Sequence, residues 1–136
     1  MKLLKISILI IILAISPALN SAKAQTSDDI LNKVEAAIKG GNSVGLAKYF
    51  NSTIDLELLE NDDTYSKTQA ELIIKNFFKK YPPKSFSIKQ KGSSNDGSKF
   101  SIGIYNSTNN KTFRTYFLIK KVSGKYKIHL LQFEEE

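Results

Sequence analysis

The stretch YSKTQAELIIKNFFKKYPPKSF, residues 65–86, decides the fold. It contains a helix with clear start and stop signals, followed by prolines that direct the chain into a strand. Ser66 and Gln69 have the spacing of a capping box, in which each side chain satisfies a backbone N–H at the start of a helix. The apolar residues behind this cap recur at helical spacing and predict one buried face: Ala70, Ile73, Ile74, Phe77 and Phe78. Lysines in the last turn complement the helix dipole, and Pro82-Pro83 cannot continue the helix. A helix stop therefore accounts for the segment KKYPPK, and the chain is expected to enter a strand directly after it.

Upstream of this helix, the sequence predicts two more helices and a strand. The first helix begins behind a cap at Thr26 or Ser27 and ends at Gly40-Gly41, where glycine can adopt the left-handed conformation of a helix C-terminus. Its buried stripe comprises Ile30, Leu31, Val34, Ala37 and Ile38. A short helix is expected from Ser43. Residues 52–60, STIDLELLE, then alternate apolar and acidic side chains, as a strand with one solvated face does.

Four strand-like runs follow the helix that begins behind Ser66: residues 84–91, 99–106, 112–121 and 125–133. Between them stand Asp96-Gly97, Asn109-Asn110 and Ser123-Gly124, residue types that favour tight hairpin turns. Helices grouped first and an antiparallel meander grouped last predict an α+β domain. Its helices are expected to cover one face of a curved sheet.

The first 24 residues have the pattern of a cleaved secretory signal peptide. A basic start with Lys2 and Lys5 precedes an apolar run over residues 6–15, and the triplet Ala22-Lys23-Ala24 offers a cleavage site after Ala24. The apolar run is shorter than the ~20 residues that a membrane-spanning helix needs. We therefore expect an exported protein, periplasmic or secreted, with no membrane span after cleavage. The sequence has no cysteine, so no disulfide can hold the mature chain together.

The mature chain is expected to form a single domain over residues 25–136. Its 112 residues suit one hydrophobic core, and loss of the three lysines of residues 1–24 lowers the formal net charge from +7 to +4. The remaining charge is uneven: residues 25–72 hold four lysines and nine acids, whereas residues 73–133 hold thirteen Lys or Arg and the single acid Asp96. Such asymmetry creates a surface field that attracts anions.

The order of elements resembles that of the nuclear transport factor 2-like superfamily, a cone-shaped, cystatin-like α+β fold. Within it, the segments LAKYFN, YSKTQAELIIKNFF, PPKSF and the closing GKYKIHLLQFEEE are similar to the domain-of-unknown-function 4783 family of small exported bacterial proteins. The resemblance implies the fold and export, and it brings no established activity. The wider superfamily includes isomerases, dehydratases and cyclases with acids, histidines or tyrosines in a pocket at the open end of the cone. It also includes members that only bind ligands or that dimerise through the sheet.

The period of two along the four strands of the meander predicts which side chains share a face. The core face is expected to hold Phe86, Ile88, Phe100, Ile102, Ile104, Phe113, Phe117, Ile119, Tyr126, Ile128 and Leu130. The opposite face is expected to hold Lys89, Lys91, Lys99, Tyr105, Arg114, Tyr116, Leu118, Lys120, Lys127, His129, Leu131 and Phe133. This second set is more aromatic and apolar than an ordinary solvated face.

The sequence is consistent with three roles for the second face. Its lysines can be solvating groups that discourage edge aggregation, with aromatic pairs stabilising the sheet. It can be a homodimer or partner interface, for which Tyr116, Leu118, Leu131 and Phe133 are suitable residue types. It can also bind an anionic ligand such as an acidic glycan or lipid headgroup, with Tyr105, Arg114 and His129 contributing; nucleic acid is disfavoured for an exported protein.

Catalysis is the weaker hypothesis for this sequence. His129 has a side chain suited to proton transfer, Asp55 is the most plausible distant carboxylate for it, and Tyr105 is the remaining candidate. These residues would serve an isomerase or hydro-lyase in the cone pocket, and a His129/Asp55 pair requires both side chains on one face. The segment from Glu60 to Asp63 is expected to be an acidic surface turn, because it lacks the glycine and the later glutamate of a calcium loop.

We expect no metal and no cofactor, because phosphate loops, nucleophile elbows and zinc spacings are absent from the sequence. The preferred interpretation is a non-enzymatic domain of the cell envelope that binds a protein partner or a small apolar or anionic ligand. A small apolar ligand would occupy a pocket lined by Phe, Ile and Tyr between helices and sheet. The alternatives are the small-molecule enzyme and a domain that only dimerises as a scaffold.

Overall fold

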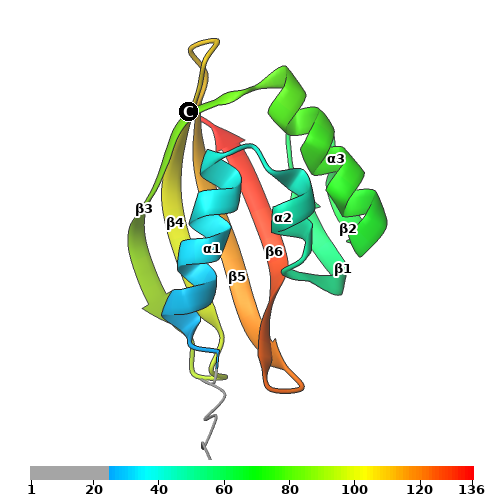
Figure 1. The fold of residues 1–136 in the computed structure, drawn as a ribbon, viewed down its shortest axis with the longest axis vertical. Helices are drawn as coiled ribbons and strands as arrows, with labels where there is room; N and C mark the ends of the chain where they lie inside the picture. The colour runs from blue at the N-terminus through cyan, green and yellow to red at the C-terminus, as the bar shows by residue number, and fades with distance from the viewer. Residues whose placement is uncertain (1–24) are drawn as a thin grey trace, which may run out of the picture.

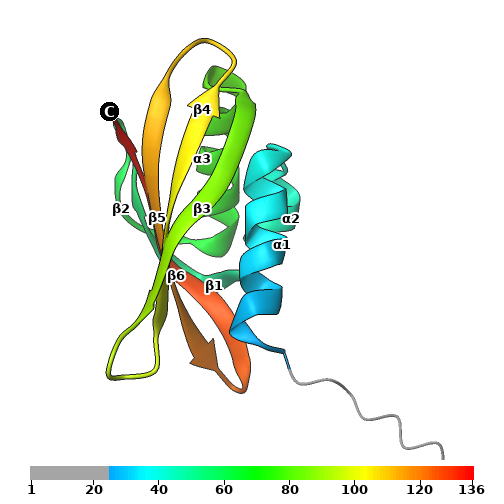
Figure 2. The same ribbon diagram turned by 90° about the vertical axis from the view of Figure 1, so that its left-hand side faces the viewer.

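A computed structural model describes residues 25–136 as two layers, a curved six-stranded sheet and three helices that cover one of its faces (Figures 1 and 2). The elements are α1 (Ser27–Lys39), α2 (Ser43–Ala47), β1 (Phe50–Glu57), β2 (Asp62–Ser66), α3 (Lys67–Lys80), β3 (Pro83–Ser93), β4 (Lys99–Ser107), β5 (Thr112–Val122) and β6 (Lys125–Glu135). The predicted signal peptide, residues 1–24, lies outside the described residues. No helix within residues 25–136 is long and apolar enough to cross a membrane.

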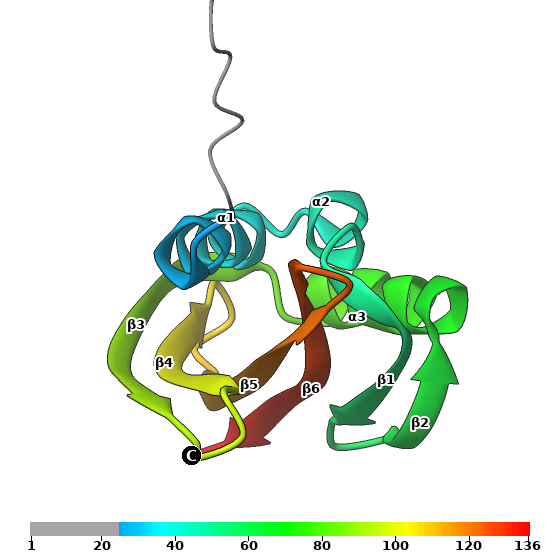
Figure 3. The ribbon, with the colours of Figure 1, turned by 90° about the horizontal axis from the view of Figure 1, so that it is seen from below.

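The strands are ordered β2-β1-β6-β5-β4-β3 across the sheet. Neighbouring strands are antiparallel except β1 and β6, which run parallel. The last strand of the domain thus lies inside the sheet, between β1 and β5. Seen from below, the sheet curls around the space beneath the helices, with α1 over the side of β3 and α3 over the side of β1 and β2 (Figure 3). This arrangement confirms the α+β class and the helix-covered curved sheet.

The helix ends follow the local sequence. Thr26 caps α1 by accepting a hydrogen bond from the Asp29 backbone N–H at 3.2 Å. Gly41, just past the end of α1, has a φ of 61°, the left-handed conformation expected there. In α3 the capping box is complete, since the Gln69 N–H donates to Ser66 Oγ and the Ser66 N–H donates to Gln69 Oε1, both at 3.2 Å. The predicted limits of α1 and α3 and the predicted start of α2 are confirmed.

The prediction of an acidic surface turn is correct for Glu60, which lies in the β1–β2 connection, and wrong for Asp62 and Asp63, which begin a strand. Asp62 pairs with Glu57 and begins β2, which runs antiparallel to β1 up to Ser66. Four of its five side chains are exposed and only Tyr65 is half-buried. An edge strand with neither face buried carries no apolar alternation, so its sequence has no period to detect.

The four strands of the meander are confirmed, each slightly longer than predicted. The turn between β5 and β6 shows why its residues suit a hairpin: Ser123 and Gly124 have φ values of 52° and 79°, both positive as a type I′ turn requires. Pro83 begins β3 directly after α3, as the helix stop predicts.

The predicted faces of β4 were wrong by one residue. Ser101 and Tyr105 are buried under the helices, whereas the side chains expected in the core lie half-buried on the opposite side: Phe100, Ile102 and Ile104. Gly103 faces inward as well, and the ring of Phe86 on β3 covers it so closely that an added Cβ would lie 2.7 Å from that ring. The large apolar residues of β4 thus lie on the uncovered side, and the buried side consists of small or polar residues and Tyr105, with room over Gly103 for the Phe86 ring.

The faces of β6 change midway, at a β-bulge. Leu118 pairs with Leu130 but the next residue, Ile119, pairs with Ile128, so His129 is the extra residue of the bulge. His129 and Leu130 therefore both lie half-buried on the outer side, and the alternation resumes one residue out of step. Leu131 and Phe133, predicted for the outer face, are consequently core residues, and Leu130, predicted for the core, is not.

Candidate functional site

The sheet face that the helices leave uncovered is the main candidate site, and we call it the outer face. Its central side chains, all half-buried, are Phe100, Ile102, Ile104, Arg114, Tyr116, Leu118, Lys120, His129, Leu130 and Gln132. Of the residues that the sequence predicted as a ligand or interface surface, Arg114, Tyr116, Leu118 and His129 lie there. Tyr105, Leu131 and Phe133 do not.

Six large apolar side chains form a continuous band across the outer face, called here the apolar band: Phe100, Ile102, Ile104, Tyr116, Leu118 and Leu130. The strand register makes them neighbours, because Ile102 pairs with Tyr116 and Leu118 pairs with both Phe100 and Leu130. The rings of Phe100 and Tyr116 stack with their centroids 6.1 Å apart. Four members of this band were missed from the sequence, because the β4 faces were exchanged and the bulge in β6 was not predicted.

Charged side chains of both signs border the apolar band. Arg114 pairs with Glu134 across the β5–β6 ladder, and Lys120 lies at the other end of the outer-face run of β5. Asp55 and Glu57 lie on β1, opposite Leu130 and Gln132. In residues 25–136, no carboxylate oxygen lies within 4.0 Å of the Arg114 or Lys120 side-chain nitrogens. These charged groups therefore form no ion pair with any other described residue.

His129 and Asp55 share the outer face, since Asp55 is the β1 partner of Leu130, the residue beside His129. The Asp55 carboxylate accepts a hydrogen bond from the Thr64 hydroxyl at 2.5 Å. Among the described residues, His129 Nε2 is buried and has no hydrogen-bond partner. Burial lowers the pKa of His129, Lys120 lowers it further, and Asp55 opposes both. The pair shares a face, but no group of residues 25–136 is hydrogen-bonded to His129 Nε2 to orient the imidazole for proton transfer.

Replacing His129 with glutamine is expected to weaken the pH dependence of stability between about pH 7.5 and about pH 5.5. Because the folded protein lowers the pKa of His129, the unfolded chain takes up the proton first as the pH falls. Wild-type stability is therefore lost on acidification below the ordinary histidine pKa. His129 is the single histidine of the sequence, so urea unfolding of both proteins at several pH values isolates its effect. Equal slopes for wild type and H129Q would contradict this prediction.

Tyr105 belongs to the core. Its side chain is fully buried, its hydroxyl donates to the backbone carbonyl of Tyr81, and burial raises its pKa. Its ring packs among those of Phe77, Phe113 and Phe133, with centroids between 5.5 and 6.0 Å away. The sheet therefore separates Tyr105 from His129 and Asp55, and the three catalytic candidates do not converge. The same aromatic rings fill the space under α3 where an apolar ligand was expected.

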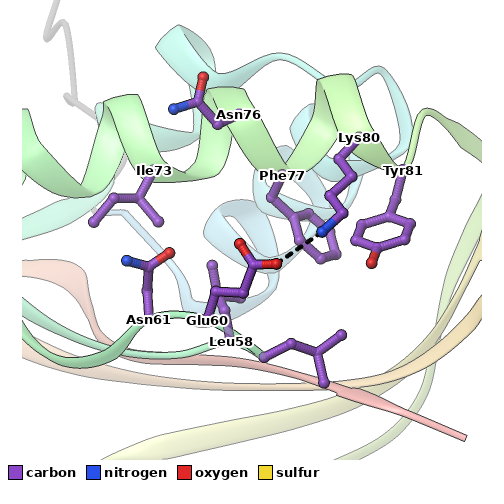
Figure 4. A pocket seen from close by; sticks show the side chains of 9 residues that line it. Leu58, Glu60, Asn61, Ile73, Asn76, Phe77, Lys80 and Tyr81 are labelled. Atoms are coloured by element: carbon purple, nitrogen blue, oxygen red, sulfur yellow. Dashed lines mark hydrogen bonds and ion pairs between the residues drawn. The ribbon is translucent and has the colours of Figure 1, made fainter.

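A small pocket opens beside α3, between that helix and the β1–β2 connection (Figure 4). Leu58, Ile73 and Phe77 form its apolar wall, and Lys80 reaches across to Glu60, with Nζ 2.9 Å from Oε1. Their hydrogen bond lowers the pKa of Glu60 and raises that of Lys80. The pocket holds about 90 Å³, whereas sites for organic ligands usually measure ~300–1,000 Å³. It has room for a few waters and not for a substrate.

Comparisons with known proteins agree with this architecture. The model of a family described as "Domain of unknown function (DUF4783)" matches residues 31–134. A DUF4783 family protein from Bacteroides uniformis is 32% identical, with a TM-score of 0.72 over 77% of this chain and 95% of that one. A second, from Bacteroides ovatus, is 29% identical, with a TM-score of 0.71 over 76% and 93%.

More distant structures share the fold alone. An NTF2-like protein of unknown function from Shewanella baltica is 18% identical, with a TM-score of 0.59 over 80% of this chain and 90% of that one. No curated protein matches the sequence. The fold is therefore nuclear transport factor 2-like.

Proposed function

This chain belongs to the DUF4783 family and has a nuclear transport factor 2-like fold, and from that premise we propose that it is a non-enzymatic binding domain whose outer face binds a second copy of itself. One observation carries the proposal: the apolar band lies on a sheet face that no helix covers. Contiguous apolar surface bordered by polar groups is typical of protein interfaces, in which aromatic side chains are enriched.

The charges around the band favour a second copy over a foreign partner. In a two-fold symmetric interface the same face meets itself, so a face of one sign would repel its own copy. The outer face instead carries the bases Arg114 and Lys120 together with the acids Asp55, Glu57 and Glu134. Neither base forms an ion pair within the described chain, so each can pair with a carboxylate of the other copy.

The position of the enzyme candidates favours binding over catalysis. A proton-transfer site needs an acid or base within hydrogen-bond reach of a group that orients it. The only histidine lacks such a group among the described residues, and Tyr105 lies on the other side of the sheet. We place the domain in the cell envelope; the support for this setting is the basic and then apolar pattern of residues 1–24.

Light scattering on residues 25–136, the part that holds every described helix and strand, tests the proposal. We expect a dimer whose mass changes little with salt, because the interface is mainly apolar. Leu118→Glu would bury a charge in the centre of the band and is expected to weaken dimerisation at least about 100-fold, or ~2.7 kcal/mol.

Leu72→Glu is the matched control, because Leu72 is 58% exposed on α3, away from the outer face. This variant should keep the wild-type mass. A wild-type protein that stays monomeric at every concentration, or an L118E variant that dimerises as well as L72E, would overturn the proposal.

A further inference from the structure

A second candidate surface is polar rather than apolar: it is a hollow of about 450 Å³ that is lined by four lysines. We call it the lysine hollow. Lys33 comes from α1, Lys48 follows α2, and Lys125 and Lys127 come from the start of β6. Figures 1 and 3 show why these segments can meet, because the start of α1 and the β5–β6 hairpin lie at the same end of the molecule.

Two hydrogen bonds donated by backbone amides of β6 hold walls of this hollow. The Tyr126 N–H donates to the side-chain Oε1 of Gln25 at 2.8 Å, and the Ile128 N–H donates to the carbonyl oxygen of Tyr49 at 2.7 Å. Gln25 and Tyr49 both line the hollow, so two distant segments are fixed to alternate amides of one strand. Lys127 stands between those amides. These two hydrogen bonds thus fix Gln25 and Tyr49 against β6 in the folded domain.

The charge of the hollow is uncompensated. Four lysines line it against one acid, Asp29, which gives a formal charge of +3. Within residues 25–136, none of these lysines has a carboxylate oxygen within 4.0 Å of its Nζ; the lysines that do are Lys80, Lys91 and Lys111. Burial lowers the pKa of Lys127, and the neighbouring charges of Lys67 and Lys125 lower it further. A bound anion would relieve this repulsion.

We propose that the lysine hollow binds the phosphate groups of a phosphorylated ligand. Lysine ammonium groups act as point charges that can surround a tetrahedral anion, and lysine is a common phosphate ligand. The single arginine of the sequence, Arg114, lies on the outer face, and the hollow uses lysine alone. Its charge of +3 suits a ligand carrying more than one negative charge, and its volume suits a headgroup-sized ligand.

The proposal is tested on residues 25–136 with two phosphate probes, pyrophosphate in solution and vesicles of phosphatidylglycerol. Calorimetry measures the first, and co-sedimentation measures the second against phosphatidylcholine vesicles. The test variant is Lys48→Gln with Lys125→Gln, which removes two exposed charges from two different segments that line the hollow. The control is Lys75→Gln with Lys79→Gln, which removes two exposed charges from α3.

We expect binding to at least one probe, weakened about 10-fold or more in the test variant and much less in the control. Binding of pyrophosphate identifies a soluble phosphorylated ligand, and binding of the vesicles alone identifies a lipid headgroup; both support the phosphate site. Binding of neither probe, or an equal loss in test and control variants, overturns it. Citrate bound as tightly as pyrophosphate would also overturn it, because the hollow would then not select phosphate.

Discussion

Replacing Phe133 with alanine is expected to lower the free energy of unfolding by about 3–5 kcal/mol, the usual cost of removing a buried phenylalanine. The ring is 2% exposed and its centroid lies 4.4 Å from that of Phe77 on α3. It also packs against Tyr105 and Phe113, so its loss would open a cavity that rigid aromatic neighbours cannot close.

Urea unfolding of residues 25–136 measures this effect. Phe133→Leu keeps most of the buried volume and is expected to cost roughly 1.5 kcal/mol or less. Leu72→Ala, on the exposed side of α3, should change stability by no more than ~0.5 kcal/mol. A cost below ~1 kcal/mol for F133A would instead place the ring on the outer face and refute the bulge in β6.

Gly103→Ala is expected to lower the free energy of unfolding by about 2–3 kcal/mol, because the added methyl group would clash with its neighbours. Its Cβ would lie 2.7 Å from both the Phe86 ring and the backbone oxygen of Ser87. Phe86 is 3% exposed and held in the core, and the Ser87 carbonyl belongs to the neighbouring strand. Neither neighbour can move without disturbing the β3–β4 ladder.

Gly92→Ala is the matched control for Gly103→Ala, and it has an even shorter contact. An added Cβ there would lie 2.1 Å from the ring of Phe100, but that ring is half-buried on the outer face and can rotate away. Alanine also loses less conformational entropy than glycine on folding, by ~0.5–1 kcal/mol. We therefore expect G92A to be nearly neutral in urea unfolding. Equal costs for the two variants would show that the distance alone, and not the freedom of the neighbour, decides the result.

Features encoded within a few residues could be predicted from the sequence. The caps at Thr26 and Ser66, the stop at Pro82-Pro83 and the hairpin turns each depend on neighbouring residues, and all are confirmed. The α+β class follows from their order. The parallel pairing of β1 with β6 could not be predicted in this way, because it joins segments about 75 residues apart and no local sequence signal marks it.

The sites were predicted less well than the elements, because faces depend on contacts between strands. The extra residue at His129 shifts the alternation of β6 by one position. As a result Leu131 lies in the core and Leu130 on the outer face, the reverse of the prediction. For β4 the apolar set Phe100, Ile102 and Ile104 lies on the uncovered side, so the alternation selected the wrong face. The lysine hollow combines lysines from three elements, and no spacing along the chain reveals that they meet.

The place of β6 inside the sheet has a consequence for how the domain is made. Because β6 separates β1 from β5, the first strand to leave the ribosome has no permanent partner on that side until the last strand has been synthesised. Native pairing of this kind has a high contact order, which slows folding. The complete sheet can therefore form only after the whole domain has emerged, and until then β1 has β2 as its single permanent neighbour among the described strands.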